Sequence, residues 1–286
     1  MALVTMKEML INARRDGYAV GAFEFWSYDS AKAVVSTAEK MKMPVILQVG
    51  HFERDYMDGY LNAYRIAQMA AEQVSVPVAL HLDHAEEYSE VLSALQAGFT
   101  SVMIDASAKS FEENVFLTRE VVALAGKFKA SVEAELGQLS GSEGKISSET
   151  DLLTDPECAQ EFAEKTGIDA LAVAIGTAHG FYKRTPHIDI SRLKEIAGRV
   201  SIPLVLHGGS GTPQDKVAEA VNYGIAKVNI CTEFIEAFAL GIEEGREKPD
   251  FSYNVENLFV SGRRKAEQLV ESKIKLFSNG KNSGLV

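Results

Sequence analysis

Short runs of apolar and β-branched residues alternate with longer amphipathic stretches along the chain. Eight such runs can be counted, and segments with helical spacing of their apolar positions lie between them. This alternation predicts repeated strand–helix units around a parallel sheet. The predicted strands are Tyr18–Phe23, Val45–Val49, Val78–Asp83, Ser101–Asp105, Ser131–Glu135, Ala170–Ala174, Leu204–His207 and Ala226–Asn229.

The turns support this organisation, because several predicted strands follow a proline or a glycine-containing turn, as in MPVIL, VPVAL and IPLVL. Eight such units in 286 residues favour an α/β fold of the closed (β/α)8 type, a TIM barrel, formed as one domain over residues 1–286. Right-handed crossovers then place the carboxyl end of every strand on one face. Functional side chains are expected on that face.

Two parts of the chain depart from the repeat. Residues Gly137–Thr154 are rich in Gly, Ser and Glu and too long for an ordinary connection, so we expect a mobile lid there. After the last strand, helical patterns over Thr232–Glu244 and Val255–Phe277 predict an extra C-terminal helical segment before a polar tail, Ser278–Val286.

Composition narrows the possible partners. The net charge of −11 opposes general binding to nucleic acid or to an anionic membrane. The sequence has neither a signal-peptide pattern nor an apolar run that could cross a bilayer, so a cytoplasmic location is expected. Its two cysteines, Cys158 and Cys231, lack metal-site spacing and are expected to be reduced thiols.

Three of the six histidines fall at or just after different predicted strands, where they reach the carboxyl face. Any one of them alone is more simply explained as a structural histidine. Zinc, however, favours neutral imidazole nitrogens, and a catalytic zinc site keeps three protein ligands and one open position. The joint placement of His84, His179 and His207 therefore predicts a zinc site.

Strand alternation points His81 and Asp83 into the barrel, whereas His84 has left the strand and can turn toward its mouth. Asp83 then lies beside the predicted metal. We predict that it moves a proton on a substrate hydroxyl, although it could instead orient a ligand imidazole. His81 sits deeper and is predicted to support the site from behind the ligands.

The inward faces of two other strands carry charge. Glu133 and Glu135 share a face of the fifth strand, and Lys227 shares a face with Asn229 on the eighth. This pattern predicts a buried charge cluster. It also leaves open a Schiff-base aldolase, because a desolvated lysine such as Lys227 can act as a nucleophile.

The glycine run 208–211 (GGSG) follows the seventh strand, and residues 229–232 (NICT) follow the eighth and open a helix. In barrels of this type these two loops commonly form a phosphate site, with backbone N–H groups as donors. The run alone is a weak signal. Beside three histidines it predicts a phosphorylated carbonyl compound whose carbonyl a metal can polarise.

Six segments, taken in order, resemble the class II, metal-dependent ketose-bisphosphate aldolases, the family of fructose- and tagatose-bisphosphate aldolases. The resemblance spans nearly the whole chain. It implies reversible aldol cleavage of a ketose 1-phosphate or ketose 1,6-bisphosphate into dihydroxyacetone phosphate and an aldehyde. The segments are LHLDHA (80–85), SVMIDAS (101–107), VEAELG (132–137), AIGTAHGFYK (174–183), LVLHGGSGTP (204–213) and KVNICTE (227–233).

The resemblance implies zinc on the three histidines, and Asp83 as the group that exchanges a proton with the C4 oxygen. It places Asp105 and Glu135, with His81, near the metal, behind its ligands or at a second metal position. A lid glutamate, Glu143, would move the dihydroxyacetone phosphate proton. A monovalent cation, Na⁺ or K⁺, often lies near the phosphate, and the implied phosphate and substrate residues are Gly180, Lys183, Gly208, Gly209, Ser210, Asn229 and Thr232.

The departures from the family pattern cluster at one end of the substrate. Glu24 stands where asparagine is common, Gly50 where serine is common, and Cys231 where a polar residue is more usual. They suggest an acceptor aldehyde ending in a carboxylate, sulfonate or neutral group. The acceptor-end candidates are Glu24, Gln48, His51, Arg54 and Arg264.

Arg264 aligns with a family arginine that reaches a neighbouring subunit's substrate, which implies a homodimer or homotetramer. Besides the Schiff-base aldolase, three alternatives remain open at this point. They are a fructose- or tagatose-1,6-bisphosphate aldolase proper, a non-catalytic barrel that binds sugar phosphates, and a metal-dependent epimerase that uses Asp83 and Glu143 as opposed acid and base.

Overall fold

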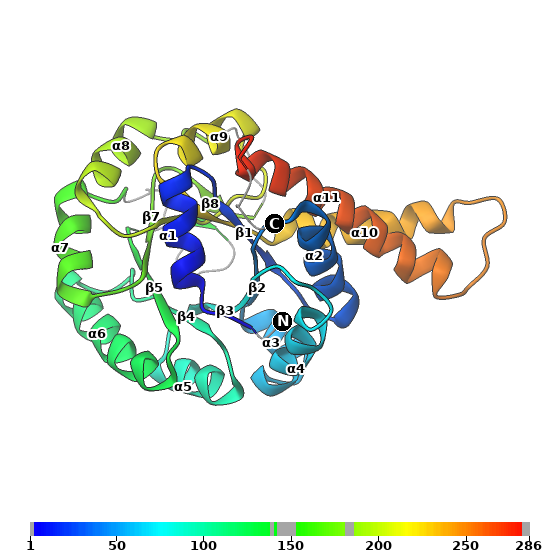
Figure 1. Cartoon of the computed structure of the whole chain (residues 1–286), viewed down its shortest axis with the longest axis horizontal. Helices are drawn as coiled ribbons and strands as arrows, with labels where there is room; N and C mark the ends of the chain where they lie inside the picture. The colour runs from blue at the N-terminus through cyan, green and yellow to red at the C-terminus, as the bar shows by residue number, and fades with distance from the viewer. Residues whose placement is uncertain (1–2, 138–139, 142–152, 181–185, 282–286) are drawn as a thin grey trace.

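In the computed structural model, which describes residues 3–137, 140–141, 153–180 and 186–281, eight parallel strands close into a barrel (Figure 1). Their order around the barrel is β1-β10-β9-β7-β5-β4-β3-β2, so the predicted α/β barrel is confirmed. The eight predicted strands are all present, with ends shifted by no more than two residues. The barrel strands are β1 (Val20–Glu24), β2 (Val45–Val49), β3 (Val78–Ala85), β4 (Ser101–Ile104), β5 (Ser131–Leu136), β7 (Ala170–Val173), β9 (Leu204–Leu206) and β10 (Ile225–Ile230).

Helices surround the barrel and bury their apolar faces against it (Figure 1). Local sequence sets their ends. The hydroxyl of Ser110 accepts a hydrogen bond from the backbone N–H of Glu113, whose carboxylate accepts one from the Ser110 N–H, and this capping box starts α6. The helices are α1 (Met6–Asp16), α2 (Tyr28–Met41), α3 (His51–Tyr56), α4 (Tyr60–Ala71), α5 (Tyr88–Ala97), α6 (Phe111–Phe128), α7 (Pro156–Thr166), α8 (Ile190–Arg199), α9 (Gln214–Asn222), α10 (Thr232–Arg246) and α11 (Ser261–Ser278).

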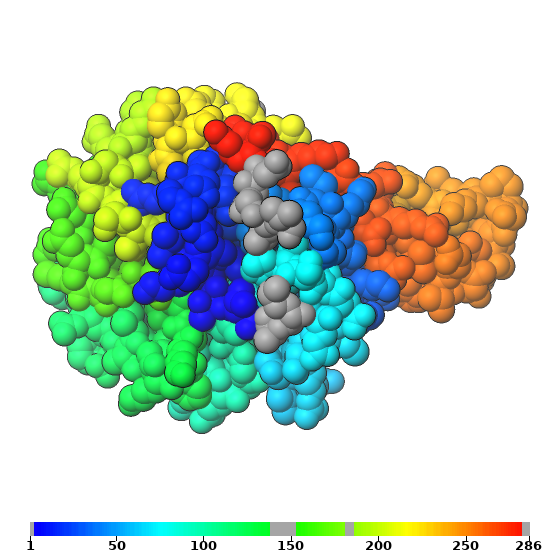
Figure 2. Space-filling view, in the orientation of Figure 1, coloured from blue at the N-terminus to red at the C-terminus, as the bar shows by residue number. Residues whose placement is uncertain are grey.

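The amino end of the barrel is covered by the first residues of the chain. The backbone N–H of Val4 donates to the carbonyl of Val78 at 2.9 Å, and that of Met6 donates to the hydroxyl of Ser131 at 3.2 Å. Met6 and Leu10 of α1 are fully buried. Figures 1 and 2 show α1, in blue, lying across this face. The opposite, carboxyl face carries the polar strand ends.

The predicted extra C-terminal segment is present. Helices α10 and α11 pack together and extend beyond the barrel, as the orange and red arm in Figures 1 and 2 shows. The second predicted helix starts with a π-helical turn, Glu256–Val260, before α11. Close packing requires glycine here, because a Cβ on Gly245 would lie 2.0 Å from the carbonyl oxygen of Asn257.

A small parallel pair was not predicted. Residues 140–141 (β6, Ser140–Gly141) pair with β8 (Ala178–His179), so the start of the predicted lid lies beside a predicted metal ligand. Residues 142–152 of that segment are outside the described part of the chain. Neither Cys158 nor Cys231 forms a disulfide within the chain. None of the helices in the described ranges has the length and apolar character needed to cross a bilayer.

Candidate metal centre and substrate pocket

The three histidines that the sequence singled out lie together at the carboxyl face. The ring centroid of His84 is 4.9 Å from that of His179 and 4.6 Å from that of His207. One ligand nitrogen from each ring lies within 4.8 Å of the other two. They come from β3, β8 and the residue after β9, so the barrel brings together side chains that are far apart in sequence.

A bulge in β3 makes this convergence possible. Leu82 pairs with Val102 and Ala85 with Ile104, so β3 has one residue more than β4 between these pairs. Within the bulge His84 has a φ of 47°, in the left-handed region. Successive residues of a regular strand point to opposite faces, and the bulge re-aims His84 to the same site as its neighbour. The strand thus continues past His84 instead of ending before it as predicted.

A carboxylate orients the His84 ring. Its Nδ1 is 2.8 Å from Oδ2 of Asp105, and Oδ1 of Asp105 accepts a hydrogen bond from the Ser107 hydroxyl at 2.7 Å. The other nitrogen, Nε2, is buried and has no hydrogen-bond partner among the described residues. Burial would lower the pKa of His84, but the acids around the ring raise the pKa well above the usual value, so the metal-free ring is protonated. Asp105 at Nδ1 leaves Nε2 as the nitrogen that can give up its proton and bind a metal. This orphaned nitrogen fits a divalent cation.

His207 is held between two glutamates. Its Nδ1 is 2.9 Å from Glu135 and its Nε2 is 2.8 Å from Glu133. Burial alone would lower the pKa of His207, but the hydrogen bonds to both carboxylates outweigh it and raise the pKa to about 9. The ring therefore donates at both nitrogens, and one proton must leave before the ring can bind a cation.

The predicted buried charge cluster lies beneath this site. Nζ of Lys227 is 2.9 Å from Glu133, and both side chains are fully buried. His81 is also fully buried, and its Nδ1 is 2.8 Å from the Ser101 hydroxyl. Burial, together with the charge of Lys227, lowers the pKa of His81 to about 3, so this ring is neutral. Lys227 is committed to an ion pair and is not a free amine.

Asp83 occupies the centre of the site. Its Oδ2 accepts a hydrogen bond from Nε2 of Gln48 at 3.1 Å, and its Oδ1 accepts one from Nδ2 of Asn229 at 3.2 Å. Burial would raise the pKa of Asp83, but the positive charges of His84 and Lys227 outweigh it and lower the pKa to about 2. Asp83 is thus an oriented carboxylate, and it lines the two cavities described next.

The smaller cavity gathers the predicted phosphate residues. A glycine run and the first turn of α10, a 15-residue helix, meet there, so the helix N-terminus faces the cavity. Gly209 is not among the described lining residues of this cavity, and its N–H donates to the Asn229 carbonyl at 3.2 Å. Lys183 and Glu143 lie outside the described residues. The lining residues are Gln48, Asp83, His179, Gly180, Gly208, Ser210, Asn229, Cys231 and Thr232.

Replacing Gly208 by alanine should lower the free energy of unfolding by about 2–4 kcal/mol. Its φ is +65°, and an added Cβ would lie 2.3 Å from the carbonyl oxygen of Ala178. Urea unfolding measures the change. The matched control is Gly126→Ala in α6, where a Cβ meets no atom within 4 Å, and which should stabilise by about 0.5–1 kcal/mol. Equal effects of the two substitutions would contradict this account of Gly208.

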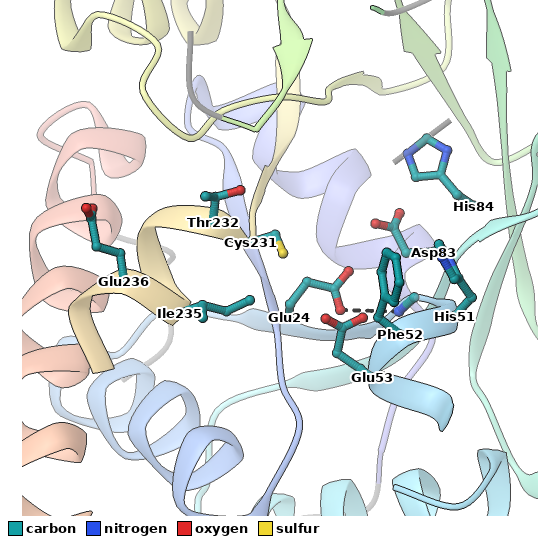
Figure 3. Close-up of a pocket in the computed structure, with 11 residues that line it drawn as sticks. Glu24, His51, Phe52, Glu53, Asp83, His84, Cys231, Thr232, Ile235 and Glu236 are labelled. Carbon is teal, nitrogen blue, oxygen red and sulfur yellow. Dashed lines mark hydrogen bonds between the residues drawn. The ribbon is translucent and has the colours of Figure 1, made fainter. Parts of the chain in front are cut away.

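The larger cavity, of about 550 Å³, is also lined by Asp83 and contains Glu24 and His51, two of the acceptor-end candidates (Figure 3). Four of its residues were not singled out from the sequence, namely Phe52 and Glu53 of α3 and Ile235 and Glu236 of α10. Their place in the sequence could have identified them, because α3 directly follows β2 and α10 directly follows β10. The described lining is Glu24, Gly50, His51, Phe52, Glu53, Asp83, His84, Cys231, Thr232, Ile235 and Glu236.

The structure does not bring Arg54 or Arg264 to this cavity within one chain. The guanidinium of Arg54 donates instead to Glu90 of α5 at 2.8 Å and to the hydroxyl of Tyr60, at the start of α4, at 3.2 Å. Arg264 lies exposed on α11 and pairs with Glu256 at 2.8 Å. Its predicted role concerns a neighbouring subunit, which a single chain does not test.

Comparison with known proteins decides which chemistry this geometry belongs to. Residues 4–282 match the family model described as fructose-bisphosphate aldolase class-II. The chain belongs to this family. It is therefore a class II aldolase, a metal-dependent lyase, and the Schiff-base alternative through Lys227 is wrong.

Individual relatives match over almost their full length. A fructose-bisphosphate aldolase of Geobacillus stearothermophilus is 40% identical over 284 residues, which cover 98% of this chain and 99% of that protein. One of Staphylococcus epidermidis is 39% identical over 279 residues, or 97% of this chain and 98% of that protein. The crystal structure of the YdjI aldolase from Escherichia coli K12 has a TM-score of 0.85 and 34% identity, with 98% of this chain and 99% of that chain covered.

Proposed function

We propose that this protein is a zinc-dependent aldolase that reversibly cleaves a ketose 1-phosphate into dihydroxyacetone phosphate and an aldehyde other than glyceraldehyde 3-phosphate. The supporting observation is that Asp83, beside the three clustered histidines, lines both of two unlike cavities. The smaller one is lined by glycines and a helix N-terminus, which suits a phosphate. The larger one is lined by acidic and apolar side chains, which suits a different group.

In this proposal the nitrogens of His84, His179 and His207 hold the divalent cation, which when bound polarises a carbonyl and stabilises the negative charge that develops beside it. Asp105 orients the ring of His84 through the 2.8 Å contact to Nδ1. Asp83 takes the proton of the C4 hydroxyl as the C3–C4 bond breaks, and returns it in condensation.

The remaining roles are proposals of the same kind. Backbone and side chains of Gly180, Gly208, Ser210, Asn229 and Thr232 bind the C1 phosphate, supported by their common cavity, with Na⁺ or K⁺ nearby. Lys183 assists substrate binding, and Glu143 moves the C3 proton of dihydroxyacetone phosphate. A homodimer or homotetramer would let Arg264, which is exposed on α11, reach a partner's substrate.

A second candidate is a fructose- or tagatose-1,6-bisphosphate aldolase proper. It is favoured by the relatives at 39–40% identity, which are named fructose-bisphosphate aldolases. Both candidates share the dihydroxyacetone phosphate half of the reaction and differ only in the acceptor half. A direct comparison of substrates separates them.

We expect kcat/KM for cleavage of at least one ketose 1-phosphate to exceed that for fructose and tagatose 1,6-bisphosphates by at least about tenfold. The reason is the altered acceptor end, where Glu24 replaces an amide and lines the larger cavity. Release of dihydroxyacetone phosphate, followed by an NADH-coupled reductase, measures the rates. If a bisphosphate is clearly the best substrate of the panel, the second candidate is correct and the narrower proposal is wrong.

A further inference from the structure

Glu24 is a buried carboxylate that faces the larger cavity. It ends β1, its exposed fraction is 4%, and Figure 3 shows its carboxylate beside that of Glu53. Its Oε2 accepts a hydrogen bond from the backbone N–H of Gly50 at 3.2 Å, and its Oε1 accepts one from Nε2 of Gln48 at 3.3 Å. Two donors from β2 and the turn after it therefore fix its orientation.

Gly50 leaves space for the carboxylate of Glu53 and lies in contact with that of Glu24. A Cβ at this position would lie 3.1 Å from Oε2 of Glu53 and 3.6 Å from Oε1 of Glu24. The φ of Gly50 is −88°, which any residue adopts, so its backbone conformation does not require glycine. The tight contact is with Glu53, and Gly50 is joined to Glu24 by the hydrogen bond from its backbone N–H. The two departures from the family pattern form one structural unit.

Gln48 connects this unit to the reacting end of the site. Its Nε2 donates to Glu24 and, at 3.1 Å, to Oδ2 of Asp83. Because the amide nitrogen faces two carboxylates, the amide oxygen is turned away from them. That Oε1 atom is buried and has no hydrogen-bond partner among the described residues, although Gln48 lines the smaller cavity. An unpartnered buried acceptor is suited to a ligand that brings a donor.

The charge of the larger cavity also favours a ligand that brings a hydrogen-bond donor. Glu24, Glu53 and Glu236 line it together with Asp83, and the basic side chains of the described lining are those of two histidines, His51 and His84. A phosphate, carboxylate or sulfonate on the acceptor would face these carboxylates in a partly desolvated site, where like charges repel strongly. A hydroxyl group, in contrast, can donate its hydrogen to one of these carboxylates.

We propose that the acceptor aldehyde carries no anionic group and is hydroxylated, and that Glu24 determines this specificity by accepting a hydrogen bond from an acceptor hydroxyl. The inference rests on the proposed aldolase function and names the class of its second substrate. Gly50 is a positioning residue whose backbone N–H orients Glu24. Gln48 donates to both Glu24 and Asp83 and so fixes their relative positions.

The test uses the condensation direction, with dihydroxyacetone phosphate and either D-glyceraldehyde or D-glyceraldehyde 3-phosphate, two acceptors that differ only in a phosphate. The wild type should favour glyceraldehyde in kcat/KM by at least about tenfold. Glu24→Gln keeps the shape but removes the charge, and should reduce this ratio at least about fivefold. The matched control, Glu120→Gln on the exposed face of α6, should leave the ratio unchanged.

Solvent deuterium exchange into dihydroxyacetone phosphate, measured by NMR without any aldehyde, reports the donor half alone. If exchange proceeds but the wild type prefers the phosphorylated acceptor, or Glu24→Gln leaves the ratio unmoved, the inference about the acceptor is overturned while the aldolase proposal stands. If wild-type protein loaded with zinc shows neither exchange nor condensation, both are overturned. If exchange proceeds and Glu24→Gln shifts the acceptor ratio as expected, both the aldolase proposal and the inference about the acceptor are supported.

Discussion

Replacing Asp83 by asparagine should lower kcat for cleavage of the best ketose phosphate by roughly 10²–10⁴-fold, the range expected for loss of a positioned acid–base group. Asparagine has nearly the same shape but cannot take the proton of the C4 hydroxyl at neutral pH. The structure keeps Asp83 ionised, since nearby positive charges lower its pKa to about 2 despite its burial. Steady-state cleavage rates measure the loss.

The exchange reaction of dihydroxyacetone phosphate separates the two roles that the sequence left open for Asp83. Removal of the C3 proton does not involve the C4 oxygen. The fold decrease that Asp83→Asn causes in the cleavage rate should therefore be at least about tenfold larger than the fold decrease in the exchange rate. If Asp83 instead orients a ligand imidazole, cleavage and exchange should fall together, and bound zinc should fall with them. Metal analysis of the purified variant therefore accompanies both rates.

The convergence of the histidines could be predicted because it depends on fold class more than on detail. Hydrophobic alternation specifies which segments are strands, and a parallel barrel brings their carboxyl ends to one face whatever the exact register. His84, His179 and His207 are separated by long stretches of sequence, yet they meet for that reason. The bulge that turns His84 into the site could not be predicted, because no residue pattern signals a φ of 47° at a histidine.

The acceptor end was harder to predict because it depends on tertiary partners. Arg54 follows β2 closely enough to be a candidate, but Glu90 of α5 binds its guanidinium and turns it away from the cavity. Long side chains can follow many directions, so sequence position alone does not decide where they end. Glu24 and Gly50 were both noticed as departures. Only the structure shows that the two positions are in contact, with the Gly50 N–H donating to Glu24 at 3.2 Å.

Removing the divalent cation with a strong chelator should lower the rate of cleavage by more than about 10³-fold, since carbonyl polarisation contributes several kcal/mol to the barrier and the remaining groups cannot replace it. Zinc should restore the activity of the wild type. The fit rests on His84, whose buried Nε2 lacks a partner among the described residues. Activity during chelation and zinc titration, with metal content measured in parallel, tests this expectation.

Two variants separate metal binding from other causes of inactivity. His84→Ala removes a ligand, so zinc should not restore its activity at concentrations that saturate the wild type. Asp105→Asn keeps the ligand but weakens its orientation, so it should bind zinc about 10–100-fold more weakly and recover activity when zinc is raised. If zinc restores the activity of Asp105→Asn but not that of His84→Ala, the result identifies Nε2 as the metal-binding atom, because Asp105 contacts His84 only at Nδ1, at 2.8 Å. Full activity of metal-free wild type would contradict the metal centre itself.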